Sequence, residues 1–288
     1  MSDTGGKNEV SPGRTPRADT IGRRGFLTSG LAGLLAAGLW PGGLEGQNPS
    51  EQFQFVAMND THFRDDKDIQ YFQQLAEQIK GTEGAADFIL HAGDIVDGGL
   101  VTQLGAMKSF FESLHKPYHL VPGNHDVDSG DGSLRSYRKV FGKREANAWF
   151  VHKGWQFVGL DSTEGTKWEN VQIQAANLAW LHETLAKLDR REPLILFTHI
   201  PLGSGVRYQA ANADAVLSMF VEHNLKAIIN GHFHGYTMRG YRGAGITTDR
   251  CLSQWRANMD GSLEKGYFRC TVAAGQVGRE FISFDFKT

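Results

Sequence analysis

Histidines, carboxylates and one amide follow the ends of several short apolar segments in this sequence. Asp60 and His62 form one pair with a single residue between them, and His232 and His234 form another. On an extended backbone, residues two apart point to the same side, so each pair can present two side chains to one ligand. The full set of such residues is Asp60, His62, Asp94, Asn124, His125, His199, His232 and His234.

The donor types in this set favour a metal site. Imidazole, carboxylate and amide groups without a thiolate suit a borderline divalent ion such as Zn, Mn or Fe, and suit copper(I) or an iron–sulfur cluster poorly. Each motif alone is weak evidence, because Asp-x-His occurs by chance and a single histidine at a strand end is commonly structural. Five such motifs, each after a separate predicted strand, favour a shared site over coincidence.

The segments that must position these residues alternate between strand and helix. Helical spacing of apolar residues predicts helices at 66–80, 100–114, 172–189 and 213–223. This alternation predicts a layered α/β domain with sheets inside, and ligands of such sheets bind beyond the carboxyl ends of the strands. Strand-rich segments at 147–161 and after 235 favour mixed sheets. Predicted strands cover 53–59, 87–91, 117–121, 148–151, 156–160, 193–197, 227–229 and 280–286.

In their order along the chain, the motifs resemble the signature of the calcineurin-like metallophosphoesterases, over about residues 53–286. The resemblance implies a four-layer αββα sandwich of two mixed β-sheets flanked by helices, with a dinuclear metal site at the loops after the strands. The motifs are Asp60-x-His62, Gly93-Asp94-x-x-Asp97, Gly123-Asn124-His125-Asp126, Thr198-His199-x-Pro201 and Gly231-His232-x-His234.

The resemblance also implies a role for each residue. His125 would face the substrate without binding metal, with Asp126 beside it as a weaker catalytic candidate. Asp97 and Asp126 would orient loops and ligands. The implied metal ligands are Asp60, His62 and His234 for one ion, Asn124, His199 and His232 for the second, and Asp94 as the bridge between them.

The activity implied is metal-dependent hydrolysis of a small-molecule phosphate ester, either a monoester or a diester. Two divalent ions, Mn, Fe or Zn, would activate the attacking hydroxide. His125 would protonate the leaving group or stabilise charge on the phosphoryl oxygens. Asp97 stands where purple acid phosphatases have tyrosine, so no ferric-tyrosinate site is expected. Gly98 and Asp126 depart from the serine/threonine phosphatase motifs. A non-catalytic metal- or phosphate-binding protein on the same scaffold and a nuclease are the alternatives.

Composition narrows the class of partner. Thirty Lys and Arg against 32 Asp and Glu give a net charge of -2, which argues against a broad basic face and stable nucleic-acid binding. Two cysteines exclude a disulfide scaffold and a zinc site of CxxC type. Cys251 and Cys270 lie on neighbouring strand-like segments and could pair outside the cytoplasm.

Residues 1–47 are predicted to be a disordered N-terminus followed by an export segment, and residues 48–288 a single metallophosphoesterase domain. Arg23 and Arg24 precede an uncharged apolar stretch at 26–40, which resembles a twin-arginine signal. The twin-arginine machinery would then be a partner and the periplasm the destination, with membrane anchoring if the leader stays uncut. The alternative is a buried helix preceded by two basic residues.

Other residues carry weaker expectations. Arg207 and Tyr208, soon after His199, are candidates for substrate contact, although an exposed loop arginine is commonly without such a role. His91 and His119 are predicted in the core or next to the site. The scattered tryptophans Trp149, Trp155, Trp168, Trp180 and Trp255 are predicted to serve packing, and His115, His152, His182 and His223 to lie at the surface.

Overall fold

The computed structural model describes residues 52–142 and 146–287. Within these ranges the chain alternates strands and helices, as the sequence predicts. The strands are β1 Phe53–Met58, β2 Ala86–Ala92, β3 Tyr118–Val121, β4 Ala148–His152, β5 Trp155–Leu160, β6 Pro193–Thr198, β7 Asn224–Asn230, β8 Thr237–Tyr241, β9 Ala244–Thr248, β10 Lys265–Ala273 and β11 Gln276–Phe284. The α-helices are α1 Ile69–Thr82, α2 Val101–Ser113, α3 Arg135–Phe141, α4 Ala175–Leu185 and α5 Ala213–Ser218.

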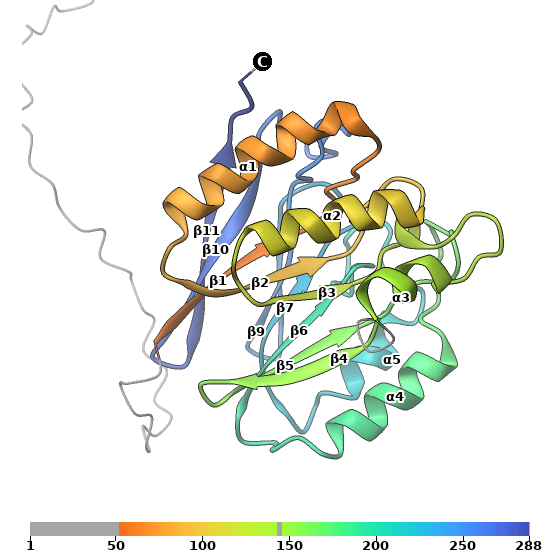
Figure 1. Ribbon diagram of the computed structural model, residues 1–288. Coiled ribbons are helices and arrows are strands. Elements are labelled where there is room, and N and C mark those ends of the chain that lie inside the picture. The colour runs from red at the N-terminus through yellow and green to blue at the C-terminus, as the bar shows by residue number, and fades with distance from the viewer. Residues whose placement is uncertain (1–51, 143–145, 288) are drawn as a thin grey trace, which may run out of the picture. The chain divides into compact units, whose positions relative to one another are not determined.

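The strands form two mixed sheets (Figure 1). The first has the order β11-β10-β1-β2-β3, in which β1, β2 and β3 are parallel and β10 is antiparallel to both of its neighbours. The second has the order β4-β5-β6-β7-β9-β8, with a parallel centre and an antiparallel strand at each edge. The prediction of two mixed sheets is confirmed.

The alternation of side chains along β1 shows how the layers are held together. Phe53, Phe55 and Ala57 point into the apolar layer between the two sheets, where Phe55 meets Phe157 of β5 edge-on at 5.8 Å. Val56 and Met58 point to the opposite face and pack under the helices. Because both faces of this strand are buried, β1 is apolar along nearly its whole length rather than alternating with polar residues.

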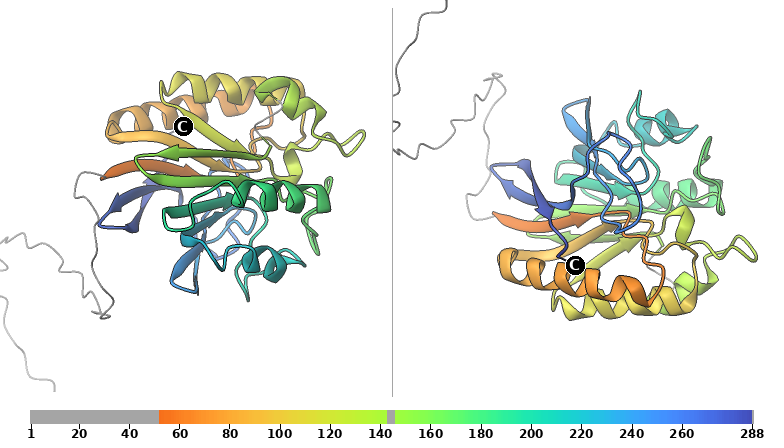
Figure 2. Two further views of the ribbon diagram at one scale, coloured as in Figure 1. Left: turned by 90° about the horizontal axis from the view of Figure 1, so that it is seen from below. Right: turned by 90° about the horizontal axis from the view of Figure 1, so that it is seen from above.

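Helices cover the outer face of each sheet (Figure 2). Leu75 and Ile79 of α1 and Met107 and Phe111 of α2 bury their side chains in the core beneath the first sheet's helices. On the second sheet the equivalent layer contains Leu181 and Leu185 of α4 and Val216 and Leu217 of α5. The result is the predicted four-layer αββα sandwich.

Some element boundaries differ from those predicted by apolar periodicity, because contacts between distant segments also decide where an element begins. The helix expected at 213–223 ends at Ser218, and β7 begins at Asn224 rather than at residue 227. Asn224 bonds through its backbone N–H to the Arg190 carbonyl and through its side chain to that of Arg191, which extends the strand. Helix α3 is absent from the predicted elements; it is short and buries Tyr137.

The two cysteines do not form the pair that the sequence left open. Cys251 and Cys270 are both buried and free. Cys270 faces Phe55 in the layer between the sheets, whereas the Cys251 sulfur lies in a loop, 3.0 Å from the Lys265 ammonium. Their different surroundings arise because side chains alternate along β10, which places Cys270 with Phe268 and Val272 on the inner face of the sheet, whereas Cys251 lies in a loop.

The predicted export segment and the boundary near residue 47 lie outside the described residues. Among the helices that the structure describes, none combines the length and apolar character needed to cross a membrane.

Candidate metal centre

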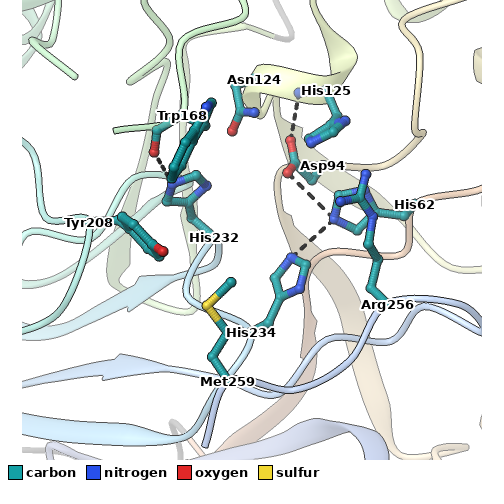
Figure 3. Close-up of a pocket in the computed structure, with 10 residues that line it drawn as sticks. All are labelled: His62, Asp94, Asn124, His125, Trp168, Tyr208, His232, His234, Arg256 and Met259. Atoms are coloured by element: carbon teal, nitrogen blue, oxygen red, sulfur yellow. Dashed lines mark hydrogen bonds and ion pairs between the residues drawn. The ribbon is translucent and has the colours of Figure 1, made fainter. Parts of the chain in front are cut away.

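The loops that follow β1, β2, β3, β6 and β7 meet at one edge of the sandwich (Figure 3). Because β1, β2 and β3 are parallel, and β6 and β7 are parallel, their carboxyl ends lie side by side. Backbone hydrogen bonds then join the loops: Asp60 N–H donates to the Gly93 carbonyl at 3.0 Å, and Gly231 N–H donates to the His199 carbonyl at 3.1 Å. All the predicted donor residues are therefore brought to one place.

The backbone at these donors is left-handed rather than extended. Asp60 has φ 53°, His62 46°, Asp94 55°, His232 68° and His234 50°. The expectation that each pair projects from an extended segment is wrong, because these loops turn sharply directly after their strands. A left-handed residue with a side chain costs about 1–2 kcal/mol, so five of them together indicate a geometry that the surrounding packing enforces.

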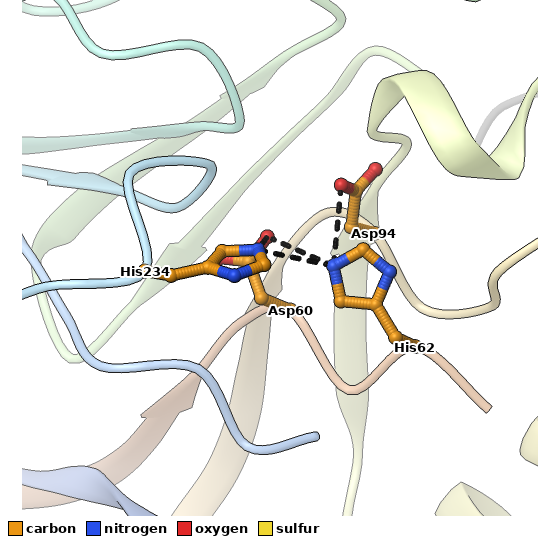
Figure 4. Close-up of side chains that lie close together, drawn as sticks. All are labelled: Asp60, His62, Asp94 and His234. Atoms are coloured by element: carbon orange, nitrogen blue, oxygen red, sulfur yellow. Dashed lines mark hydrogen bonds and ion pairs between the residues drawn. The ribbon is translucent and has the colours of Figure 1, made fainter. Parts of the chain in front are cut away.

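Asp60, His62 and His234 form the first cluster (Figure 4). The His234 Nε2 atom lies 3.1 Å from Asp60 Oδ1 and 3.1 Å from His62 Nε2, and His62 Nε2 lies 3.7 Å from the same Asp60 oxygen. Asp94 joins the cluster through Oδ2, 3.5 Å from His62 Nε2. Four side chains thus converge with their donor atoms facing one another.

Asp94, His199, His232 and Asn124 form the second cluster. The His199 Nε2 atom lies 3.3 Å from Asp94 Oδ2, 3.2 Å from Asn124 Oδ1 and 3.2 Å from His232 Nδ1. The same carboxylate oxygen of Asp94 that reaches His62 therefore also reaches His199. Asp94 belongs to both clusters, and the histidine and carboxylate ligand atoms within each cluster lie within 4.8 Å of one another.

Hydrogen bonds on the far side of the rings decide which nitrogen faces the centre. His199 Nδ1 donates to the Ala92 carbonyl at 2.9 Å, and His232 Nε2 donates to the Trp168 carbonyl at 2.6 Å. His62 Nδ1 lies 3.2 Å from the Asp97 carboxylate. Each ring thus keeps its other nitrogen for the centre, which is the usual way in which proteins orient metal-binding histidines.

Two glycines allow the loops to approach this closely. A side chain at Gly93 would lie 2.7 Å from the His199 ring, and one at Gly123 would overlap the Asp94 carboxylate. Gly93 also has φ 83°, a conformation that residues with side chains rarely adopt. The glycines of the Gly93-Asp94 and Gly123-Asn124 motifs are therefore needed for space as well as for the turn.

The buried charges support the placement of cations here. Burial opposes ionisation of Asp60, but the charge and hydrogen bond of His234, the hydrogen bond of His62 and the charge of His199 together outweigh it and hold the Asp60 pKa well below its ordinary value. Burial likewise opposes protonation of His199 and His234, but Asp94 raises the pKa of His199 to about 9 and Asp60 raises that of His234 to about 11. Without metal, protons on these rings supply the positive charge that the carboxylates require. The residues present fit a pair of divalent ions in donor type, convergence and charge.

His125 lies at the mouth of the clusters. Its Nδ1 donates to the Asp97 carbonyl at 3.1 Å, and its backbone N–H donates to Asp94 Oδ1 at 2.8 Å. Asp97 also forms an ion pair with Arg256, a residue that the sequence motifs do not include. Asp97 is thus placed, as expected, where it orients His62 and His125.

Asp126 is fully buried beneath the loops and does not line the pocket. Its carboxylate accepts hydrogen bonds from the backbone N–H groups of Gly123, Ile95 and Val96 at 2.8–3.1 Å. Burial and the charge of Asp94 raise the Asp126 pKa to about 7. These contacts suit the expected loop-orienting role and give its carboxyl group no access to a substrate.

A pocket of about 250 Å³ opens over the clusters. Sequence reasoning misses Arg256 and Met259 in its wall, because they lie in a Gly-punctuated segment without a motif. The packing role expected of Trp168 is wrong, since this residue is 51% exposed in the pocket wall; its polar neighbours Lys167 and Glu169 are the signal for exposure. Tyr208, a predicted candidate, also lines the pocket. The lining residues are His62, Asp94, Asn124, His125, Trp168, Tyr208, His232, His234, Arg256 and Met259.

The remaining histidines have structural environments. His91 is fully buried and bonds to the Thr61 hydroxyl at 3.1 Å, and burial lowers its pKa to about 3. His119 is partly buried and stacks on Phe150 at 3.6 Å. His152, expected at the surface, is half-buried between Phe53 and Phe88 and bonds to the Asp87 carboxylate at 2.7 Å.

The fold and the clustered donors define a metallophosphoesterase. The chain belongs to the calcineurin-like phosphoesterase family, whose model matches residues 53–236. It is 26% identical over 186 residues to a probable cyclic nucleotide phosphodiesterase of Psychrobacter arcticus, covering 61% of this chain and 66% of the relative. It is 27% identical over 241 residues to the uncharacterized protein YvnB of Bacillus subtilis, covering 76% of this chain but 18% of that protein.

A solved structure shows the same fold. The crystal structure of a dimetal phosphatase from Danio rerio superimposes with a TM-score of 0.57 at 16% identity, covering 81% of this chain and 99% of that one.

Proposed function

We propose that this protein hydrolyses a small phosphate ester with a pair of divalent metal ions, Mn, Fe or Zn. The observation that carries the proposal is the position of Asp94 Oδ2, 3.5 Å from His62 Nε2 and 3.3 Å from His199 Nε2. One carboxylate oxygen between two sets of ligands suits a bridge between two cations. Asp60, His62 and His234 would hold one ion, and Asn124, His199 and His232 the other.

Metal ions bound in these positions would lower the pKa of water and neutralise charge on the phosphoryl oxygens. In the hydrolysis, the oxygen of water joins phosphorus, the bond to the ester oxygen breaks, and the leaving oxygen takes up a proton. His125 is placed to assist this last step, because its Nδ1 is held by the Asp97 carbonyl and its Nε2 is left for the substrate. Arg256 supplies a positive charge at the same side of the pocket.

A phosphodiester is the first substrate class to test, since the Psychrobacter relative is named as a cyclic nucleotide phosphodiesterase. The complete donor sets and the half-buried position of His125 in the pocket wall favour an enzyme over a binding protein on the same scaffold. The net charge of -2 provides no general attraction for a long polyanion, so a nuclease is less favoured.

The test is hydrolysis of bis(p-nitrophenyl) phosphate and of p-nitrophenyl phosphate by protein loaded with Mn, Zn or Fe(II), with metal content measured on the same sample. We expect turnover of at least one ester with two metal ions per chain, and its loss in Asp94→Asn. A folded sample that binds two ions and hydrolyses neither ester would contradict the proposal and favour the binding-protein alternative.

We also propose export through the twin-arginine pathway, on the sequence of residues 23–40 alone. Replacing both Arg23 and Arg24 by lysine should leave the protein in the cytoplasmic fraction of a bacterial host, while the unchanged chain reaches the periplasmic fraction. Equal distribution of the two chains would contradict export by this route.

A further inference from the structure

One wall of the pocket is aromatic and apolar, and the opposite wall is charged. Figure 3 shows Trp168 and Tyr208 beside His232, with Met259 below them, and His62, His125 and Arg256 on the other side. Trp168 is 51% exposed and Met259 is 51% exposed. Large apolar side chains are thus left open to solvent within reach of the metal-binding residues.

The aromatic wall is built as one unit. The Trp168 and Tyr208 rings meet edge-on with centroids 5.5 Å apart, and Tyr208 in turn meets the His232 ring edge-on at 5.7 Å. The guanidinium of Arg207 lies 4.6 Å from the Tyr208 centroid. Because one ring supports the next, the orientation of Trp168 is linked to that of His232.

Backbone contacts hold the two loops that carry these rings. The Trp168 carbonyl accepts the N–H of His232 Nε2 at 2.6 Å, so the residue is tied directly to the second cluster. The Ala211 N–H donates to the Val171 carbonyl at 2.8 Å, which joins the loop of Trp168 to the loop of Tyr208. An exposed tryptophan held by this many contacts is pre-organised for a ligand.

From this asymmetry we infer that Trp168, with Tyr208 and Met259, forms a subsite that selects phosphate esters carrying a planar aromatic or heteroaromatic group. The phosphoryl group belongs at the clusters, and the organic group extends along the aromatic wall, where ring stacking replaces contact with water. The inference rests on the proposed function and deepens it.

A pair of matched substrates tests the subsite. Benzyl phosphate and cyclohexylmethyl phosphate have leaving groups of similar size and basicity, but only the first carries a planar ring. The methyl diester of each is used if diesters are hydrolysed faster. We expect the unchanged protein to prefer the benzyl ester in kcat/KM, and Trp168→Ala to reduce that preference about tenfold, the scale of one lost stacking contact.

The kcat/KM values for the two esters are measured on one sample and compared as a ratio. Partial loss of metal in the variant lowers both values equally and therefore cancels in the ratio. Trp168→Phe should restore most of the preference. Trp149→Ala is the matched control, because Trp149 is 44% exposed on β4 and does not line the pocket; it should leave the ratio unchanged.

Equal losses for the two esters in Trp168→Ala would overturn the subsite and leave the proposed function intact. The subsite would be overturned in the same way if the unchanged protein showed no preference between the esters. Absence of turnover of either ester, together with no turnover of the nitrophenyl esters, would instead count against the proposed function.

Discussion

The backbone carbonyl oxygen of Asp97 lies 3.1 Å from His125 Nδ1 and thereby fixes which nitrogen of that imidazole points toward a substrate. Because this carbonyl accepts a hydrogen bond from one ring nitrogen, the second nitrogen is left to the pocket. The last residue of the Gly93-Asp94-x-x-Asp97 motif thus orients the proposed proton donor through its backbone carbonyl.

His125→Ala is expected to lower kcat by about 10²–10⁴-fold, the usual contribution of a positioned acid or base. Metal content should stay near that of the unchanged protein, because His125 packs against the His62 ring at 4.8 Å but is not one of the residues that make up the two clusters. Steady-state kinetics and metal analysis on one sample check both points. Loss of both ions in this variant would show that His125 is a ligand.

Asp94→Ala is expected to lose both ions, whereas His234→Ala should lose chiefly one. The reason is that Asp94 Oδ2 reaches both His62 and His199, while His234 contacts only Asp60 and His62 among the proposed ligands. Metal content after dialysis against a weak chelator distinguishes the two patterns. Equal losses in the two variants would contradict the assignment of Asp94 as the bridge.

Metal binding at pH 7.5 is expected to release protons. In the metal-free protein Asp94 raises the His199 pKa to about 9, and Asp60 raises the His234 pKa to about 11, although burial opposes both shifts. Both rings are therefore protonated below these values, and metal must displace the protons, so affinity falls as the pH is lowered. Calorimetry in buffers of different ionisation enthalpy measures the release. Binding heats independent of the buffer would contradict this prediction.

Glu83→Gln is expected to destabilise the fold at pH 7 by about 2 kcal/mol, the scale of hydrogen bonds to a charged group. Glu83 is buried and accepts hydrogen bonds from Arg269 at 2.7 Å and 2.8 Å. Burial would raise its pKa, but Arg269 outweighs burial and lowers it. Because the pKa of Glu83 is lower in the folded protein than in the unfolded chain, its ionised carboxylate stabilises the fold at pH values above the ordinary pKa of about 4.5. This stabilisation is lost as the pH falls through the pKa of the folded state.

Chemical denaturation at pH 7 and pH 3 measures the free energy of unfolding of the Glu83 variant and of the unchanged protein. The difference between the two free energies should be smaller at pH 3. Glu77→Gln is the control, because Glu77 pairs with Lys80 on α1 and its side chain is 76% exposed. A loss in the Glu77 variant equal to that in Glu83→Gln would contradict the role of burial.

The amino-acid sequence alone is enough to predict the layered α/β class and the set of donor residues. Apolar periodicity depends on neighbours in the chain, so most strands and helices could be predicted from it, although the sequence indicates β8, β9 and β10 only as a strand-rich region after residue 235. The donors follow strand ends, and parallel strands place their ends at one edge, so residues as distant as Asp60 and His232 could be expected to meet.

Features that depend on contacts between loops distant in the sequence become visible in the folded chain alone. The left-handed backbone at Asp60 and His234 is enforced by hydrogen bonds to other loops, which no local pattern encodes. Arg256 and Trp168 reach the pocket because their loops pack beside Asp97 and His232. Cys251 and Cys270 remain free because the sheet directs the Cys270 side chain into the layer between the sheets, whereas Cys251 lies in a loop beside Lys265.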